Sequence, residues 1–212
     1  MPRKKQIKID AVKNFPNVFQ IEKGEVCEHR GKWNQYFKNE GELVLELGCG
    51  HGQYVLSLSE IYPEKNFIGV DLKGSRIWSG AKRAIEAKAD NATFIVSNIQ
   101  YIENYFAEAE VDEIWVTFPD PFPKPCKANR RLISPFYLEI YKKILKPGGL
   151  VHFKTDNEKL FDYALEHIKP LFVHRDIHGV EEEAVSAKDP LLQIETFYEK
   201  KFKDLGQKIY YM

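Results

Sequence analysis

Short apolar runs alternate along the chain with stretches in which apolar residues recur every three to four positions. The apolar runs predict buried strands at 43–47, 67–70, 93–96, 111–118, 150–154, 171–177 and 209–211. The periodic stretches predict helices at 53–61, 77–85, 99–106 and 160–168. They also predict a further helix that starts at Ser134-Pro135 and is ended by Pro147-Gly148-Gly149. Strands that alternate with helices are typical of an α/β fold. We therefore expect a mostly parallel, seven-stranded sheet with helices on both faces.

The first 41 residues lack this periodicity. They begin with a basic stretch (Arg3, Lys4, Lys5 and Lys8), and Pro16, Gly24 and Gly31 interrupt the remainder of the segment. We expect a partly basic, extended arm over residues 1–41, with one helical turn at 33–37. A single domain is expected over residues 42–212.

Composition excludes several classes of protein. Hydrophobic residues make up 43% and charged residues 29% of the 212-residue chain, which is ordinary for a globular protein. The 31 basic and 31 acidic residues cancel, which excludes a uniformly basic nucleic-acid binder but not a local basic patch. The three cysteines have no C-x-x-C spacing, so neither a disulfide framework nor a metal site is expected. No apolar run approaches the roughly 20 residues of a membrane span, and no secretory signal is present, so we expect a cytoplasmic protein without a membrane partner.

Ligands of such sheets bind where the strands end, so the residues after each strand are the candidates. The first strand leads into Glu46-Leu47-Gly48-Cys49-Gly50-His51-Gly52, and Gly48 and Gly50 let the backbone approach a ligand closely. The G-x-G-x-G spacing differs from the G-x-G-x-x-G of dinucleotide-binding folds, and Glu46 would repel a pyrophosphate. It suits a cation, such as the amino group and sulfonium of S-adenosylmethionine. The alternative is a glycine-rich turn that binds nothing.

Polar residues also follow the second, third and fifth strands. Asp71 lies about 20 residues after the glycines, where a ribose-binding acid is expected, and Asn98 has an amide that matches adenine. Both residues have a structural alternative, as caps of the next helix. Asp156 is either a second carboxylate at the site or, like Asn157, a helix cap. The T-x-x-E spacing from Thr196 to Glu199 by itself favours a capping box.

The segment after the fourth strand is the most unusual one. In Phe118-Pro119-Asp120-Pro121-Phe122-Pro123-Lys124, three prolines stiffen the loop and fix Asp120 at a strand end. Cations come next at Lys127, Arg130 and Arg131, with no acid between Asp120 and Glu139. Such a cluster beside a site indicates a phosphate-bearing substrate, whereas the alternative is a solvated basic loop.

Together these residues resemble the bacterial tRNA (guanine-N7)-methyltransferases, which have the Rossmann-like methyltransferase fold. The resemblance runs from Gly31-Lys32-Trp33-Asn34 almost to the C-terminus. It rests on the Glu46–Gly52 and Phe67–Asp71 segments, which many methyltransferases share. Three further segments are specific to this family in this order: Phe118–Lys124, Phe153-Lys154-Thr155-Asp156-Asn157 and Thr196-Phe197-Tyr198-Glu199.

The resemblance implies methyl transfer from S-adenosylmethionine to N7 of a guanosine in tRNA, in the variable loop. It implies cofactor contacts from Glu46, Gly48, Gly50, Asp71, Asn98 and Asp120, with Asp120 also the catalytic residue. The implied guanine-binding residues are Lys124, Asp156, Thr196, Phe197, Tyr198 and Glu199. The implied RNA contacts are Lys127, Arg130 and Arg131. The family usually has Asp where this chain has Asn98, and more cations in the basic loop. We expect a monomer or homodimer.

Three other functions compete with this one. An amino-methyltransferase acting on an exocyclic nitrogen has a D-P-P-[FY] motif, but the second proline of that motif is absent after Asp120. An NAD-dependent oxidoreductase is disfavoured by the glycine spacing and by Glu46. A non-catalytic RNA-binding module with a relic site is disfavoured because all the site carboxylates are present.

Overall fold

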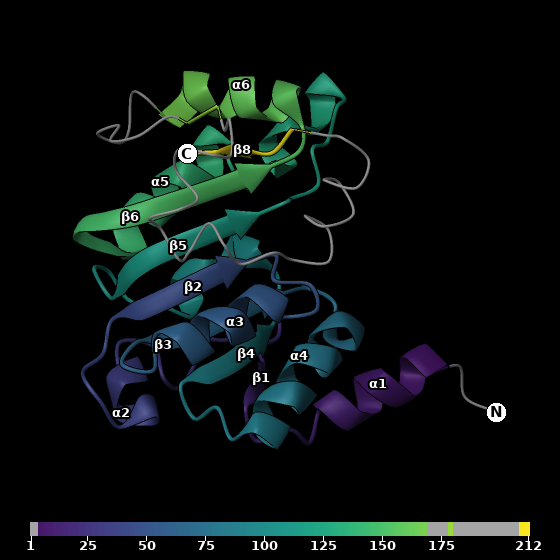
Figure 1. Cartoon of the computed structure of the whole chain (residues 1–212), viewed down its shortest axis with the longest axis vertical. Helices are drawn as coiled ribbons and strands as arrows, with labels where there is room; N and C mark the ends of the chain where they lie inside the picture. The colour runs from purple at the N-terminus through teal and green to yellow at the C-terminus, as the bar shows by residue number, and fades with distance from the viewer. Residues whose placement is uncertain (1–3, 169–177, 180–207) are drawn as a thin grey trace.

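The computed structural model describes residues 4–168, 178–179 and 208–212 of the chain (Figure 1). Its helices are α1 (Lys4–Val12), α2 (Trp33–Phe37), α3 (Gln53–Ile61), α4 (Gly74–Ala87), α5 (Pro135–Ile144) and α6 (Glu158–Ile168), with 3₁₀ helices η1 (Ile99–Asn104) and η2 (Pro125–Arg130). Its strands are β1 (Val18–Gln20), β2 (Leu43–Leu47), β3 (Asn66–Asp71), β4 (Ala92–Val96), β5 (Val111–Thr117), β6 (Leu145–Thr155), β7 (His178–Gly179) and β8 (Tyr210–Tyr211).

All eight strands of the described residues form one sheet, in the order β1-β4-β3-β2-β5-β6-β8-β7. Every neighbouring pair from β1 to β6 is parallel, whereas β8 is antiparallel to both β6 and β7. Strands β2 to β8 supply the seven strands expected of the domain, so the mostly parallel architecture is confirmed. The strand predicted at 171–177 lies outside the described residues, and β7 is the short strand found directly after it.

Helices cover both faces of the sheet, as expected. Residues of α1, α3 and α4 share one buried cluster with the sheet, and residues of α2, η1, α5 and α6 share the other. Strands β2 and β3 are buried along their whole length, which explains why they have continuous apolar runs in place of alternation. Figure 1 shows α3 and α4 in front of the sheet, with α1 beside α4.

The expectation of an extended arm was wrong, although the helical turn at 33–37 is confirmed as α2. Residues 4–12 form α1, and β1 pairs with β4 so that Val18 lies opposite Phe94. The arm is held by widely spaced apolar residues, among them Val12 and Trp33, each only 1% exposed. Such spacing has no helical or strand period, so pattern alone did not reveal it. The domain boundary at residue 42 stays a prediction.

The Pro147-Gly148-Gly149 segment does not end α5, as the sequence predicted, but lies inside β6. Helix α5 ends at Ile144, and Leu145 already pairs with Val111. The next pair joins Glu113 to Leu150, so the register shifts between them. A Cβ at Gly149 would lie 2.9 Å from the carbonyl oxygen of Asp112, so glycine allows this close approach of the two strands.

Candidate active site at the carboxyl edge of the sheet

Hydrogen bonds join the carboxyl end of β3 to that of β4, and the carboxyl end of β5 to that of β6, at one edge of the sheet. The amide of Ser97, just after β4, donates to the carbonyl oxygen of Asp71 at the end of β3 (3.1 Å). The amide of Phe118, just after β5, donates to the carbonyl oxygen of Lys154 near the end of β6 (2.7 Å). This edge therefore brings together the strand ends that precede most of the predicted site residues.

The glycine loop after β2 has a backbone that other residues adopt with difficulty. Gly48, Gly50 and Gly52 all have positive φ angles, of 79°, 55° and 65°. A Cβ at Gly52 would lie 2.5 Å from Cε1 of Phe94, so this glycine also allows the loop to pack on β4. The loop is thus a built turn that leads directly into α3.

Glu46 is a buried carboxylate beneath this loop, only 5% exposed. Its Oε1 accepts a hydrogen bond from the Thr117 hydroxyl (2.9 Å), and its Oε2 accepts one from the amide of Val55 (3.2 Å). Burial raises the pKa of Glu46 from 4.5 to about 8, and the charge of Asp71 acts in the same direction against the lowering effect of these hydrogen bonds. The sequence analysis did not identify Thr117 as a partner of Glu46. Its position at the end of β5 was the one feature that could have indicated this contact.

Asp71 is 6% exposed and connects the glycine loop to α4. Its Oδ2 accepts a hydrogen bond from the amide of Gly50 (3.0 Å), and its Oδ1 accepts one from the amide of Lys73 (2.8 Å). The alternative of an exposed helix cap does not hold, because Asp71 is buried and the N-cap position of α4 is Lys73. Each carboxylate oxygen keeps a second lone pair for a ligand.

Asn98 and Asn157 are helix caps in the structure. The Oδ1 of Asn98 accepts from the amide of Gln100 at the start of η1 (3.0 Å), and the Oδ1 of Asn157 accepts from the amide of Leu160 in α6 (2.9 Å). The capping alternative is therefore confirmed for both, and it uses only the oxygen of the Asn98 side chain, not its NH₂ donor. Asp156 is half-buried and is not the cap of α6, so its carboxylate stays a candidate for the site.

The proline-rich loop carries Asp120 in an exposed position between two residues with left-handed backbone, Phe118 (φ 46°) and Phe122 (φ 40°). The side chain of Arg131 binds the backbone of this loop. Its Nε donates to the carbonyl oxygen of Pro121 and its terminal nitrogen to that of Phe122, both at 3.1 Å. Its guanidinium also lies 4.2 Å from the ring centroid of Tyr163 in α6.

The other predicted contacts divide into two groups. Lys124, Lys127 and Arg130 are exposed on or beside η2, where phosphates can reach them. The predicted substrate-binding residues Thr196, Phe197, Tyr198 and Glu199 lie outside the described residues, and so does the capping box that their spacing favours. The structure therefore supplies geometry for the glycine loop with Glu46 and Asp71, and for the Asp120 loop.

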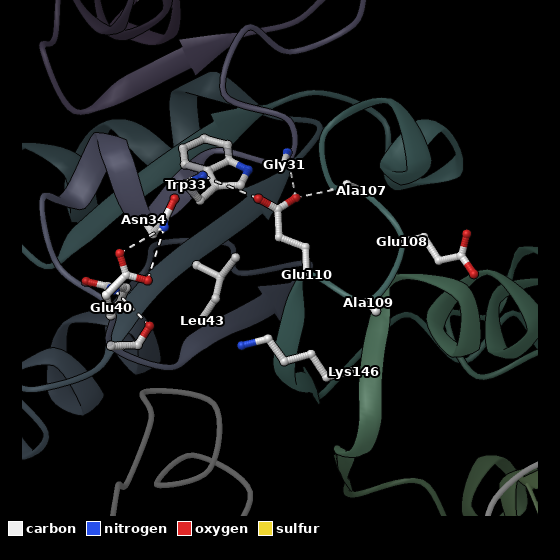
Figure 2. A pocket seen from close by; sticks show the side chains of 12 residues that line it. Gly31, Trp33, Asn34, Glu40, Leu43, Ala107, Glu108, Ala109, Glu110 and Lys146 are labelled. Atoms are coloured by element: carbon white, nitrogen blue, oxygen red, sulfur yellow. Dashed lines mark hydrogen bonds between the residues drawn. The ribbon is translucent and has the colours of Figure 1, made fainter.

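A cavity of about 320 Å³ lies at the opposite, amino edge of the sheet (Figure 2). It is lined by Leu43 and Asn66, which begin β2 and β3, and none of the predicted site residues lines it. Its central carboxylate, Glu110, accepts hydrogen bonds from the amides of Gly31, Trp33 and Ala107 (Figure 2). The Glu110 carboxylate thus links the arm to the rest of the chain, which is a structural role.

The described residues contain neither a candidate metal site nor a candidate membrane-spanning helix. The part of the chain that the structure describes has no group of three or more His, Cys, Asp or Glu side chains placed to hold a metal ion. No helix within the same residues is long and apolar enough to cross a membrane.

Comparison with known proteins places the chain in a family. A family model described as "Putative methyltransferase" matches residues 40–212. A tRNA (guanine-N(7)-)-methyltransferase of Cytophaga hutchinsonii is 38% identical over 223 residues, covering 100% of this chain and 97% of the relative. The chain belongs to the tRNA (guanine-N(7)-)-methyltransferase family. Another member of the tRNA (guanine-N(7)-)-methyltransferase family, from Christiangramia forsetii, is 43% identical over 93% of this chain and 91% of its own length.

Solved structures agree on the fold of this tRNA (guanine-N(7)-)-methyltransferase family member. The crystal structure of the 16S rRNA methyltransferase KamB is similar with a TM-score of 0.64 and 16% identity, over 92% of this chain and 97% of KamB. An antibiotic-related methyltransferase gives a TM-score of 0.65 at 15% identity, over 90% of this chain and 94% of its own. The Rossmann-like methyltransferase fold is thereby confirmed.

Proposed function

We infer that the chain transfers a methyl group from S-adenosylmethionine to N7 of a guanosine in tRNA. One observation carries the proposal: Glu46, Asp71 and the Asp120 loop lie at one sheet edge in a chain that is 38% identical over its whole length to a tRNA (guanine-N(7)-)-methyltransferase. An oxidoreductase site would instead need the anion-binding turn of dinucleotide folds, and a buried Glu46 beneath the loop disfavours a pyrophosphate there.

The cofactor half of the site fits S-adenosylmethionine. A buried carboxyl with a raised pKa, such as that of Glu46, gains most from a cation, because a cation offsets the cost of burying its charge. The ammonium group of the cofactor is such a cation. Asp71 accepts the ribose hydroxyls, Asn98 donates its amide N–H to adenine, and Gly48 and Gly50 let the backbone lie against the ligand.

The substrate half holds the guanine base. N7 of guanine has an in-plane lone pair and no proton, so its methylation needs alignment of N7, the methyl carbon and sulfur in place of a general base. Positive charge moves from the sulfonium to the purine during transfer, and the carboxylate of Asp120 stabilises it. Asp120 and Asp156 accept hydrogen bonds from the N1–H and the 2-amino group, and the proposed guanine-binding set also includes Lys124 and the stretch from Thr196 to Glu199. This pattern selects guanine over adenine.

The RNA backbone contacts Lys127 and Arg130, which are exposed, next to the Asp120 loop. Arg131 was predicted to join them, and no observation tests that contact. Because its guanidinium already donates to the carbonyl oxygens of Pro121 and Phe122, we propose that it supports the loop instead. The variable-loop position of the guanosine, a cytoplasmic location and a monomeric or homodimeric state belong to the same proposal.

The test separates methyl transfer to tRNA from the oxidoreductase and from a non-catalytic RNA-binding module. The purified chain is incubated with methyl-labelled S-adenosylmethionine and unmodified tRNA, and acid-insoluble label is counted with and without tRNA. A thermal shift with S-adenosylhomocysteine but none with NADH is expected. Label transfer that does not depend on tRNA, or a shift with NADH alone, would contradict the proposal.

A further inference from the structure

Positive charge is concentrated on α1 and α4. Residues 4–13 and 73–88 together hold nine Lys or Arg residues and two carboxylates, in a chain whose formal charge is zero. The rest of the chain is therefore acidic by the same amount. Such an asymmetry gives one region of the molecule a positive field, although composition alone indicates a neutral protein.

Packing places α1 at the same edge of the sheet as the candidate site. Val12 is 1% exposed, and a Cβ at Gly74, the first residue of α4, would lie 3.2 Å from Val12 and 3.5 Å from Val96. Gly74 and Val96 both lie near strand carboxyl ends, three residues after Asp71 and two before Asn98. The end of α1 is thus fixed beside the cofactor half of the site.

The indole ring of Trp78 in α4 contacts a lysine from each of the two helices. The ammonium of Lys8 lies 4.5 Å from the Trp78 ring centroid, and that of Lys82 lies 5.5 Å from it. Lysines from α1 and α4 therefore meet over one indole, so the two helices present a continuous positive surface.

The amino end of α1 carries charge but little packing. Val12 is its buried residue, whereas Lys4 and Lys5 are exposed, and Figure 1 shows this end pointing away from the domain. Lys4, Lys5, Lys73 and Arg76 form no ion pair with any residue that the structure describes. Their charge is therefore directed to solvent or to a partner.

We propose that this surface binds the phosphate backbone of the tRNA substrate, outside the nucleotide that is methylated. The α1–α4 basic surface consists of Lys4, Lys5, Lys8, Lys73, Arg76 and Lys82. The inference rests on the proposed function, because it is the tRNA entering the site at this edge that brings phosphates to these cations. A membrane is a poorer partner, since helices that lie on membranes have a broad apolar face and Ile7 is the one large apolar side chain that α1 exposes.

The test reverses the two exposed cations at the start of α1, as Lys4→Glu/Lys5→Glu, and separately Arg76→Glu on α4. The matched control is Lys142→Glu/Lys143→Glu, which removes the same charge from the last turn of α5, on the other face and at the other edge of the sheet. Affinity for unmodified tRNA is measured at several salt concentrations. S-adenosylhomocysteine affinity, binding to vesicles of anionic lipid and label transfer to tRNA by the unaltered protein are measured as well.

The surface variants are expected to weaken tRNA binding about tenfold or more and to flatten the salt dependence by about 0.9 in log K against log salt for each lost phosphate contact. S-adenosylhomocysteine affinity stays unchanged, and the control binds tRNA like the unaltered protein. The inference is overturned if the surface variants and the control have equal tRNA affinity and an equal salt slope. It is also overturned if the surface variants lose binding to anionic lipid vesicles while their tRNA binding stays intact. Failure of the unaltered protein to label tRNA would instead overturn the proposed function, so the two failures are distinguishable.

Discussion

A terminal guanidinium nitrogen of Arg131 donates a hydrogen bond of 3.1 Å to the carbonyl oxygen of Phe122, two residues after Asp120. Phe122 has a left-handed backbone, which is costly for a non-glycine residue and persists only where the surroundings impose it. Arg131 also binds the carbonyl oxygen of Pro121 and lies over Tyr163, so one side chain links the Asp120 loop to α6.

We therefore expect Arg131→Ala to lower kcat, by up to about 10²-fold, because a small displacement of Asp120 misaligns the reacting atoms. Arg131→Lys should restore little of this loss, since an ammonium cannot reproduce the planar fork that binds two carbonyls. The salt dependence of tRNA binding should stay unchanged in both. Steady-state kinetics and tRNA titrations measure these effects.

Arg130→Ala is the matched control for Arg131, because Arg130 is exposed and adjacent. It should raise KM for tRNA and flatten the salt slope by about 0.9, while kcat stays near that of the unaltered protein. If Arg131→Ala instead behaves like Arg130→Ala, Arg131 is an RNA contact and not a support of the loop.

Asp71→Ala should weaken S-adenosylmethionine binding by about 1.5–3 kcal/mol, because the ribose hydroxyls lose a charged acceptor. The same change leaves the amides of Gly50 and Lys73 without their partner, so it also loosens the glycine loop. Asp71→Asn keeps one acceptor oxygen, so its affinity for S-adenosylmethionine should lie between that of the unaltered protein and that of Asp71→Ala. Calorimetric titration measures the affinities, and an unchanged value in Asp71→Ala would remove Asp71 from the site.

The raised pKa of Glu46 predicts a pH dependence of stability in the absence of cofactor. The folded protein keeps the Glu46 proton up to about pH 8, whereas the ordinary pKa is 4.5, so the folded state binds more protons between these values. Stability from this group is therefore present below pH 4.5 and decreases as the pH rises toward 8, by at most about 1.4 kcal/mol per pH unit.

Urea unfolding at about pH 5.5 and about pH 7.5 tests this sign, with Glu46→Gln as the comparison. The unaltered protein should lose more stability between the two pH values than Glu46→Gln does, because the amide does not ionise. Saturating S-adenosylmethionine should reduce the difference, since a bound cation favours the ionised form. Parallel pH dependence in the two proteins would show that Glu46 is not responsible.

Asp120→Ala should lower kcat by about 10²–10³, the loss typical of one electrostatic contact to a transition state. Asp120→Asn keeps the shape without the charge and should fall between. Asp120 is exposed, so Tm should change little. The pH–rate profile should lack a basic limb from a proton-accepting carboxylate, because N7 carries no proton to remove. Normal turnover with a lowered Tm would make Asp120 a purely structural residue.

The sequence predicted the strands of the sheet well because buried parallel strands have continuous apolar runs, as in β2 and β3. It failed in the arm because Val12 and Trp33 are single buried anchors in segments without a period. The sequence located the candidate residues because turn glycines and the proline-flanked Asp120 mark the points where strands end, and their roles in the site stay predictions. Thr117 and Arg131 were not assigned their contacts, since both depend on partners that only the folded chain brings near.

The most direct test of the central claim is a mass-spectrometric map of nucleosides from tRNA after incubation with the protein and methyl-labelled S-adenosylmethionine. The account predicts that the label is found in N7-methylguanosine, at one position of the tRNA, and that Asp120→Ala removes most of it. Label in an exocyclic N-methyl nucleoside, or in no nucleoside at all while the protein binds cofactor, would contradict the account.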